Sequence, residues 1–188
     1  VKMSVEKHTM PDGSKMTGVV KDQAYVAAGT GAGGAMRAVD QSSSKAVAIG
    51  YYASQQNKGW AVSIGSLAGY SNGSTTGVLL GYKAGYQHSF GGQNVAIGYE
   101  AGYTCMGQSC VSVGQGAGRT DQGSNSVAIG RTAGETSQGK GGGSQWGGSC
   151  VAIGALAGMT SQGDQCIAIG FRAGETNQTD LTTRWAHG

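Results

Sequence analysis

The chain repeats one short motif. In each copy Val or Ile is followed by a small residue, usually a second apolar residue, then Gly, two variable residues and Ala. A period this short cannot hold two packed helices, which need more than about 30 residues, whereas two short strands and two turns fit about 16. The sequence therefore predicts an all-β solenoid of about nine 16-residue coils. The copies, most of them 15 to 17 residues apart, begin at Val26, Val47, Val62, Val78, Val95, Val111, Val127, Val151 and Ile167.

The two apolar positions of a copy are two residues apart, so a strand sends both side chains to the same face. We expect that face to be the interior of the coil. The residue between them, such as Ala128 between Val127 and Ile129, is nearly always small, which suggests the close approach of a neighbouring subunit. The isoleucines expected to form one continuous buried column are Ile49, Ile64, Ile97, Ile129, Ile153 and Ile169.

Glycine follows the second strand position in every copy, as Gly130 does in the copy that begins at Val127. An unvarying Gly implies a backbone conformation or a close approach that a Cβ atom would forbid. We interpret it as the corner of the coil. Ala recurs three residues later, as at Ala133, where a small apolar side chain fits a narrow coil.

The segments Asn94–Gly102, Ser126–Ala133 and Cys166–Gly174 carry the motif Val/Ile-Ala-Ile-Gly-x-x-Ala. These segments resemble the head repeats of trimeric autotransporter adhesins, and phage tail fibres carry similar repeats. The resemblance covers about residues 24–178. It implies a left-handed parallel β-roll, three chains side by side as a homotrimer, and a role in attachment. The continuation Ala-Gly-x-Thr looks more like that of phage or marine-virus fibres.

Composition is typical of a thin coil. Gly accounts for 37 of 188 residues, Pro for one, and charged residues for 12%, whereas an enzyme domain of this length usually has more charge and larger apolar residues. The net charge of +3 is spread along the chain, which disfavours nucleic-acid binding. No apolar run approaches the 18 or so residues that span a bilayer, so we expect no membrane insertion.

Three regions follow from the repeat boundaries. Residues 1–23 form an N-terminal connector, which either docks to another virion or fibre protein or is a disordered leader. Residues 24–178 form the β-roll, and residues 179–188 form a C-terminal tail. The chain begins without the pattern of a signal peptide, which slightly favours a viral structural protein over a bacterial one.

Two surface features are candidates for receptor binding. The repeat from Val127 contains an eight-residue excess in the loop from Gly139 to Gly148, with Lys140, Gln145 and Trp146, and protruding loops often carry binding residues. The alternative interpretation is a tolerated insertion whose Trp146 packs on the roll or on a neighbouring chain. Equivalent positions of successive coils hold Tyr70, Tyr86 and Tyr103, and a second column holds Tyr82 and Tyr99. Stacked tyrosines suit sugars, protein receptors or a subunit interface.

Catalytic and metal-binding patterns are absent from the sequence. Glu100 and Glu135 occupy repeat positions that elsewhere hold Lys, Arg, Tyr or Met, as solvated surface does. No Cys-x-x-Cys occurs, so we expect no metal site and no cofactor. Cys150 and Cys166 fall in consecutive coils at a spacing that a disulfide allows, but assembly in the cytoplasm favours free thiols. The protein is therefore not expected to be an enzyme.

Three functions remain open. The first is a trimeric viral tail fibre or spike on the virion surface, which attaches to a host-surface glycan or protein. A variant of this first function is the head of a bacterial trimeric autotransporter adhesin, on the bacterial cell surface. The second function is a purely structural shaft or capsid decoration. The third is ice binding, suggested by a column of threonines at Thr104, Thr120, Thr136, Thr160 and Thr176.

Overall fold

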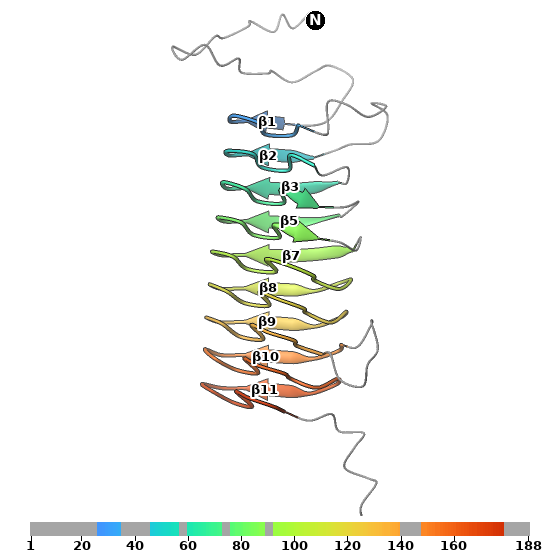
Figure 1. Cartoon of the computed structure of the whole chain (residues 1–188), viewed down its shortest axis with the longest axis vertical. Helices are drawn as coiled ribbons and strands as arrows, with labels where there is room; N and C mark the ends of the chain where they lie inside the picture. The colour runs from blue at the N-terminus through green and yellow to red at the C-terminus, as the bar shows by residue number, and fades with distance from the viewer. Residues whose placement is uncertain are drawn as a thin grey trace, which may run out of the picture.

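A computed structural model of the protein describes residues 26–34, 46–56, 60–72, 76–88, 92–139 and 148–178. In these ranges the chain forms strands and turns, and none of the described residues is helical. The strands stack along one axis as a β-solenoid (Figure 1). The predicted all-β solenoid is confirmed. The connector 1–23 and the tail 179–188 lie outside the described residues.

One parallel sheet runs the length of the described solenoid, and its strands follow one another in space in the order of the sequence. Each strand comes from one copy of the motif. A second, two-stranded parallel sheet pairs β4 (Ser71–Asn72) with β6 (Gln87–His88). The nine strands of the main sheet are β1 (Val26–Ala28), β2 (Val47–Ile49), β3 (Ala61–Ile64), β5 (Thr76–Leu80), β7 (Gln93–Ile97), β8 (Val111–Val113), β9 (Val127–Ile129), β10 (Val151–Ile153) and β11 (Ile167–Ile169).

Equivalent residues of successive copies pair across the main sheet, as the repeat predicts. Val127 in β9 pairs with Val111 in β8 on one side and with Val151 in β10 on the other. The longer step between β9 and β10, which contains the loop of residues 139–148, keeps the same register. The inserted residues therefore leave the ladder undisturbed.

A second backbone ladder joins the coils away from the main sheet. Isolated parallel bridges connect the threonines of successive coils, for example Thr120 with Thr136. The Thr136 amide donates to the Met159 carbonyl at 2.9 Å. Gln122 and Gln138, two positions after Thr120 and Thr136, are buried, so the threonine row is a single residue wide there. The column that suggested ice binding is therefore a single row of threonines.

The corner glycines have positive φ angles in all nine copies, such as 129° at both Gly114 and Gly130. A Cβ atom on Gly114 would lie 2.5 Å from the carbonyl oxygen of Gly130 in the next coil. Both the dihedral and the contact exclude an L side chain. The predicted corner is confirmed, and stacked glycines set the close spacing of coils at this edge.

The prediction that the Val and Ile side chains of each strand face the interior is wrong. In β9 the side chain of Ala128 is 0% exposed, whereas Ile129 is 37% exposed and Val127 is half-buried. The same alternation holds in β2, β8, β10 and β11, with the middle residue buried. The small middle residue therefore faces the interior and cannot contact another subunit. The isoleucines that point outward instead of forming an interior column are Ile49, Ile64, Ile97, Ile129, Ile153 and Ile169.

The thinness of each coil explains this reversal. A Cβ atom added to Gly134, across the coil from β9, would lie 3.3 Å from the Ala128 Cβ and 2.6 Å from Gln138 Oε1. Methyl groups alone therefore nearly fill the space between the two walls, and Ala133 at the turn is also buried. A β-branched Val or Ile would overpack such an interior, so these residues must take the other face of the strand.

Glutamines fill the rest of the interior in the last four coils, and of these Gln122, Gln138 and Gln162 are buried whereas Gln178 is half-buried. Gln138 Nε2 donates to the carbonyl of Val127 at 2.9 Å, and Gln122 Nε2 donates to Gln138 Oε1 at 3.1 Å. Gln162 donates in the same way to Val151 and to Gln178. Each carboxamide thus satisfies a strand carbonyl of its own coil. The sequence interpretation missed this role, although Gln recurs two residues after the last four threonines of the threonine row.

Candidate functional site

The outward Val and Ile side chains of the main sheet form a continuous stripe, which we call the apolar face. Ile49 is 39% exposed, and Ile169 in the last described strand is 65% exposed. A contiguous exposed apolar surface of this kind marks an interaction site in soluble proteins. The members that are most exposed are Val26, Ile49, Ile64, Ile129, Ile167 and Ile169.

Aromatic side chains border the apolar face at the position that follows the corner Gly in four of the nine copies. Tyr51, Tyr82, Tyr99 and Phe171 are exposed at this position. The rings of Tyr82 and Tyr99 are stacked, with centroids 5.2 Å apart and an interplanar angle of 22°. The predicted second column of tyrosines is therefore present. It places large, partly apolar rings along one edge of the apolar face.

The predicted column of Tyr70, Tyr86 and Tyr103 is also present, and we call it the tyrosine ladder. Its successive ring centroids lie 5.2 Å apart, at interplanar angles of 13° and 7°. Tyr52 contacts Tyr70 edge-on at 6.3 Å, and the guanidinium carbon of Arg119 lies 5.7 Å from the Tyr103 centroid. The rings thus cover one another's faces, so a ligand would meet mainly ring edges and hydroxyl groups.

Lys83 lies between the two tyrosine columns. Its Nζ atom is 5.2 Å from the ring centroid of Tyr82 and 5.6 Å from those of both Tyr86 and Tyr103. An ammonium group near ring faces is attracted by their quadrupoles. This cation links the two columns and places a positive charge at the centre of the aromatic surface.

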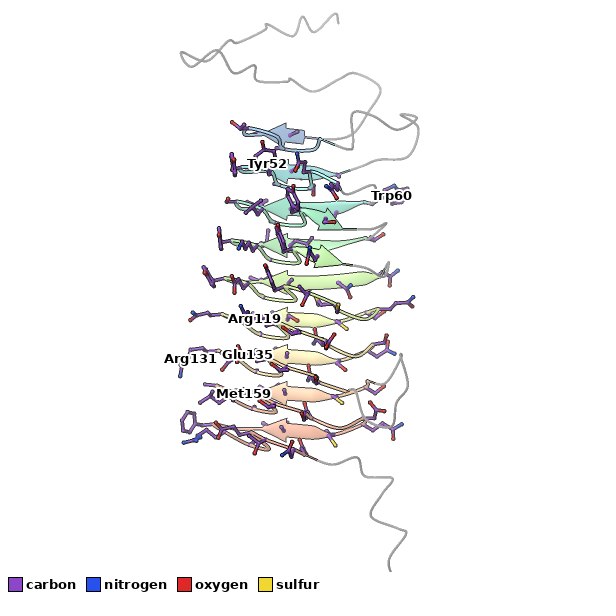
Figure 2. All side chains as sticks on the ribbon, viewed as in Figure 1. Tyr52, Trp60, Arg119, Arg131, Glu135 and Met159 are labelled. Carbon is purple, nitrogen blue, oxygen red and sulfur yellow. The ribbon has the colours of Figure 1, made fainter. Side chains whose placement is uncertain are left out.

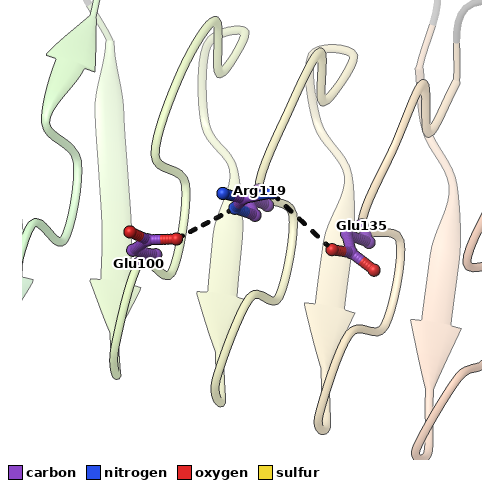
Figure 3. A network of polar contacts seen from close by, with 3 residues as sticks. All are labelled: Glu100, Arg119 and Glu135. Carbon is purple, nitrogen blue, oxygen red and sulfur yellow. Dashed lines mark hydrogen bonds and ion pairs between the residues drawn. The ribbon is translucent and has the colours of Figure 1, made fainter.

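The tyrosine ladder ends in a charged cluster (Figure 3). Arg119 Nε lies 3.0 Å from Glu100 Oε2 and its Nη1 lies 3.9 Å from Glu135 Oε1. Side chains of this part of the solenoid, including Arg119, Arg131 and Glu135, project from the turns (Figure 2). Along the axis, the aromatic surface therefore gives way to a charged one at Arg119. Both pairs are only partly buried, and ion pairs near the surface contribute little stability individually.

The predicted binding loop cannot be placed. Lys140, Gln145 and Trp146 all lie outside the described residues. Gly139 and Gly148, which bound the loop, are described, and a Cβ atom on Gly139 would lie 2.7 Å from the Gly148 Cα atom. The two ends of the loop therefore lie close together, and both are buried.

No disulfide joins the four cysteines, all of which are described. Cys110 and Cys150 are buried, and their Sγ atoms donate to the carbonyls of Gly123 at 3.1 Å and Gly163 at 2.9 Å. Burial raises the pKa of the Cys110 thiol to about 11, and it raises the pKa of Cys150 as well. Buried thiols with raised pKa values are poor nucleophiles. These two cysteines act as small interior side chains.

Within the described ranges, no group of three or more His, Cys, Asp or Glu side chains is placed to hold a metal ion. The three described glutamates, Glu100, Glu135 and Glu175, lie in ion pairs with arginines. The site that the described residues define is therefore a pair of surfaces, the apolar face and the aromatic columns beside it. In the same part of the chain, no helix has the length and apolar character needed to cross a membrane.

Comparisons with protein-family models, with curated proteins and with solved structures find no significant match to this chain.

Proposed function

We propose that the protein is a trimeric viral tail fibre or spike component that attaches to a host cell surface. Three chains lie side by side as left-handed β-rolls of about nine coils each, with their apolar faces packed together. The observation that carries this proposal is the exposed apolar face, which runs from β1 to β11. The repeat resemblance supports the number three and the attachment role.

Burial supports the association of chains. The interior of each coil holds mainly Ala, Ser, Cys and Gln, so a single chain buries little aliphatic surface. Most Val and Ile side chains of the motif lie instead on the apolar face. Burying them against other copies at roughly 25 cal/mol per Å2 supplies stability that the interior lacks. The small middle residues, which first suggested a subunit contact, play no part in this interface.

We assign recognition of the host surface to the outward-facing side chains that differ from coil to coil. The candidates are the hydroxyl groups and ring edges of Tyr70, Tyr86 and Tyr103, and the loop with Lys140, Gln145 and Trp146. The partner is a glycan or protein of the host surface. Residues 1–23 join the fibre to other virion or fibre proteins. The head of a bacterial surface adhesin is the alternative setting for the same arrangement.

A purely structural shaft is the second candidate, and the tyrosine ladder favours it. Ring faces that stack on one another at 5.2 Å stabilise the coils but offer no flat platform to a sugar. In this case Lys83 and Arg119 complete a structural ladder and the binding tip lies in another protein.

Adsorption to cells distinguishes the two candidates. We expect the purified protein to bind a subset of a panel of bacterial and algal cells. We expect Trp146→Ala to weaken that binding while the trimer remains folded, because one aromatic anchor can dominate a contact. The exposed Gln115→Ala substitution is the matched control. Normal adsorption by Trp146→Ala and by a Tyr86→Ala, Tyr103→Ala double variant would contradict the attachment sites and favour the shaft.

A further inference from the structure

Tyr82 and Tyr99 are held in a stacked pair by the backbone. Each follows a corner Gly, Gly81 after β5 and Gly98 after β7. The two strands pair in parallel register up to the residues just before these glycines. The ring centroids therefore lie 5.2 Å apart in consecutive coils, at an interplanar angle of 22°.

The pair is accessible and isolated in its column. Tyr82 is 38% exposed and Tyr99 is 51% exposed, so a reagent in solution reaches both rings. The equivalent positions in the coils on either side hold Ser66 and Gln115. A radical formed on Tyr99 therefore has one tyrosine as its neighbour in the column.

The tyrosine ladder is less favourable for one-electron oxidation. Its rings are only partly exposed, the Lys83 ammonium lies over Tyr86 and Tyr103, and Arg119 also lies over Tyr103. A nearby cation disfavours the loss of an electron from a ring, by Coulomb's law. Lys83 lies over Tyr82 as well, so it is the greater exposure of the pair that favours its oxidation over that of the ladder, and Tyr99, the more exposed ring, is where oxidation of the pair begins.

We propose that Tyr82 and Tyr99 form a site of oxidative cross-linking. A one-electron oxidant of the haem peroxidase and hydrogen peroxide class removes one electron and the phenolic proton from each ring. The two tyrosyl radicals combine through a carbon–carbon bond between the ring carbons next to the hydroxyls. The hydrogen on each of these carbons moves to the oxygen and restores the phenols. One hydrogen peroxide accepts the two electrons and two protons and becomes two waters.

The bond would join the coils of β5 and β7 within one chain. A covalent link between consecutive coils limits the unfolded chain as a disulfide does, which stabilises the folded solenoid. This chemistry requires only the stacked pair and an external oxidant. It is independent of the proposed attachment role, and in the proposed trimer it requires that these rings, which lie at the edge of the apolar face, stay exposed.

The test treats the full-length protein with a haem peroxidase and dilute hydrogen peroxide. We expect dityrosine fluorescence to appear, together with a cross-linked peptide pair that has lost two hydrogen atoms. Trypsin cleaves after Lys83 and so separates Tyr82 from Tyr99, and fragmentation of the pair locates the linked residues. Tyr99→Phe keeps the stacked ring but lacks the phenol, and we expect it to abolish this product. Tyr51→Phe, at the same position in another coil, is the matched control and should react normally.

Denaturing electrophoresis distinguishes links within a chain from links between chains. We expect the cross-linked product to migrate as a single chain. Covalent dimers or trimers as the main product would overturn the proposal, as would a dominant link among Tyr70, Tyr86 and Tyr103. If dityrosine forms no faster in the folded protein than in the urea-unfolded chain, the proposal is also contradicted, because stacking of Tyr82 on Tyr99 would then not promote the coupling.

Discussion

Ala128 and Ile129 are neighbours in β9, yet the first is completely buried and the second is 37% exposed. The polypeptide thus places its smaller side chain inside and its larger apolar side chain outside. This inversion is repeated along the main sheet, and it produces the apolar face on which the proposed assembly depends.

The two faces of β9 should respond differently to substitution. Ala128→Leu should lower the free energy of unfolding by about 1–3 kcal/mol at any protein concentration, because Gln138 already fills that coil. Ile129→Thr should also lower the free energy of unfolding by more than about 0.5 kcal/mol, although Ile129 is partly exposed on a single chain, because its side chain packs against other chains. Urea unfolding at one fixed protein concentration measures both variants. An Ile129→Thr variant as stable as the wild type would argue against the apolar face as an interface.

The corner glycines should not tolerate a side chain. Gly114→Ala places a Cβ atom 2.5 Å from the Gly130 carbonyl oxygen at a φ of 129°. Gly116→Ala is the matched control, because its Cβ would lie 3.5 Å from the nearest atom, Thr132 Cγ2, at a φ of 64°. We expect the control to cost about 1 kcal/mol and Gly114→Ala to cost at least about 2 kcal/mol more. Equal unfolding midpoints for the two variants would contradict the close approach of the corners.

The buried glutamines should be needed for stability. Gln138→Ala removes the donor to the Val127 carbonyl and the acceptor for Gln122 Nε2. Leaving buried polar groups unsatisfied costs about 1–3 kcal/mol each. The exposed Gln115→Ala should change stability by less than about 0.5 kcal/mol. Thermal unfolding measured on both variants checks this, and a neutral Gln138→Ala would show that the carboxamide ladder is dispensable.

The Cys110 thiol should make the fold sensitive to alkali. Its pKa is raised by burial from an ordinary 9.0 to about 11, so the folded state holds the proton more tightly than the unfolded state does. The associated stability is fully present below pH 9 and is lost as the pH rises from about 9 to 11, with a limit on the order of 3 kcal/mol.

Cys110→Ser isolates this contribution, because Ser126 occupies the same position in the next coil and other groups titrate equally in both proteins. We expect the variant to lose less stability than the wild type between pH 8 and 11. Parallel pH profiles for the two proteins would mean that the thiol does not ionise on unfolding.

The repeat predicted the fold well because the spacing of its copies determines where the strands lie and how they pair. Corner Gly130 and turn Ala133 are required by the backbone and by the narrow coil in every copy, so strand positions, register and stacked columns follow from the sequence. The alternation of Val127 and Ile129 showed that they share a face. It could not show which face, because hydrophobicity favours the interior only where the interior has room.

The candidate site was predicted less completely. The columns of Tyr70, Tyr86 and Tyr103 and of Tyr82 and Tyr99 follow from the register. Contacts such as that between Glu100 and Arg119 depend on how far side chains extend across coils. The repeat pattern does not predict such contacts. The interior role of Gln122, Gln138 and Gln162 was not predicted, because a single Gln at a turn is ordinarily a solvated residue.

The central claim is that the apolar face packs against identical chains, and the mass of the protein in solution tests it most directly. Sedimentation velocity from micromolar to nanomolar concentration, with circular dichroism on the same samples, should give a species of three times the 18.8 kDa chain mass, with loss of β structure wherever it dissociates. A folded β-rich species of single-chain mass across the whole range would contradict the account.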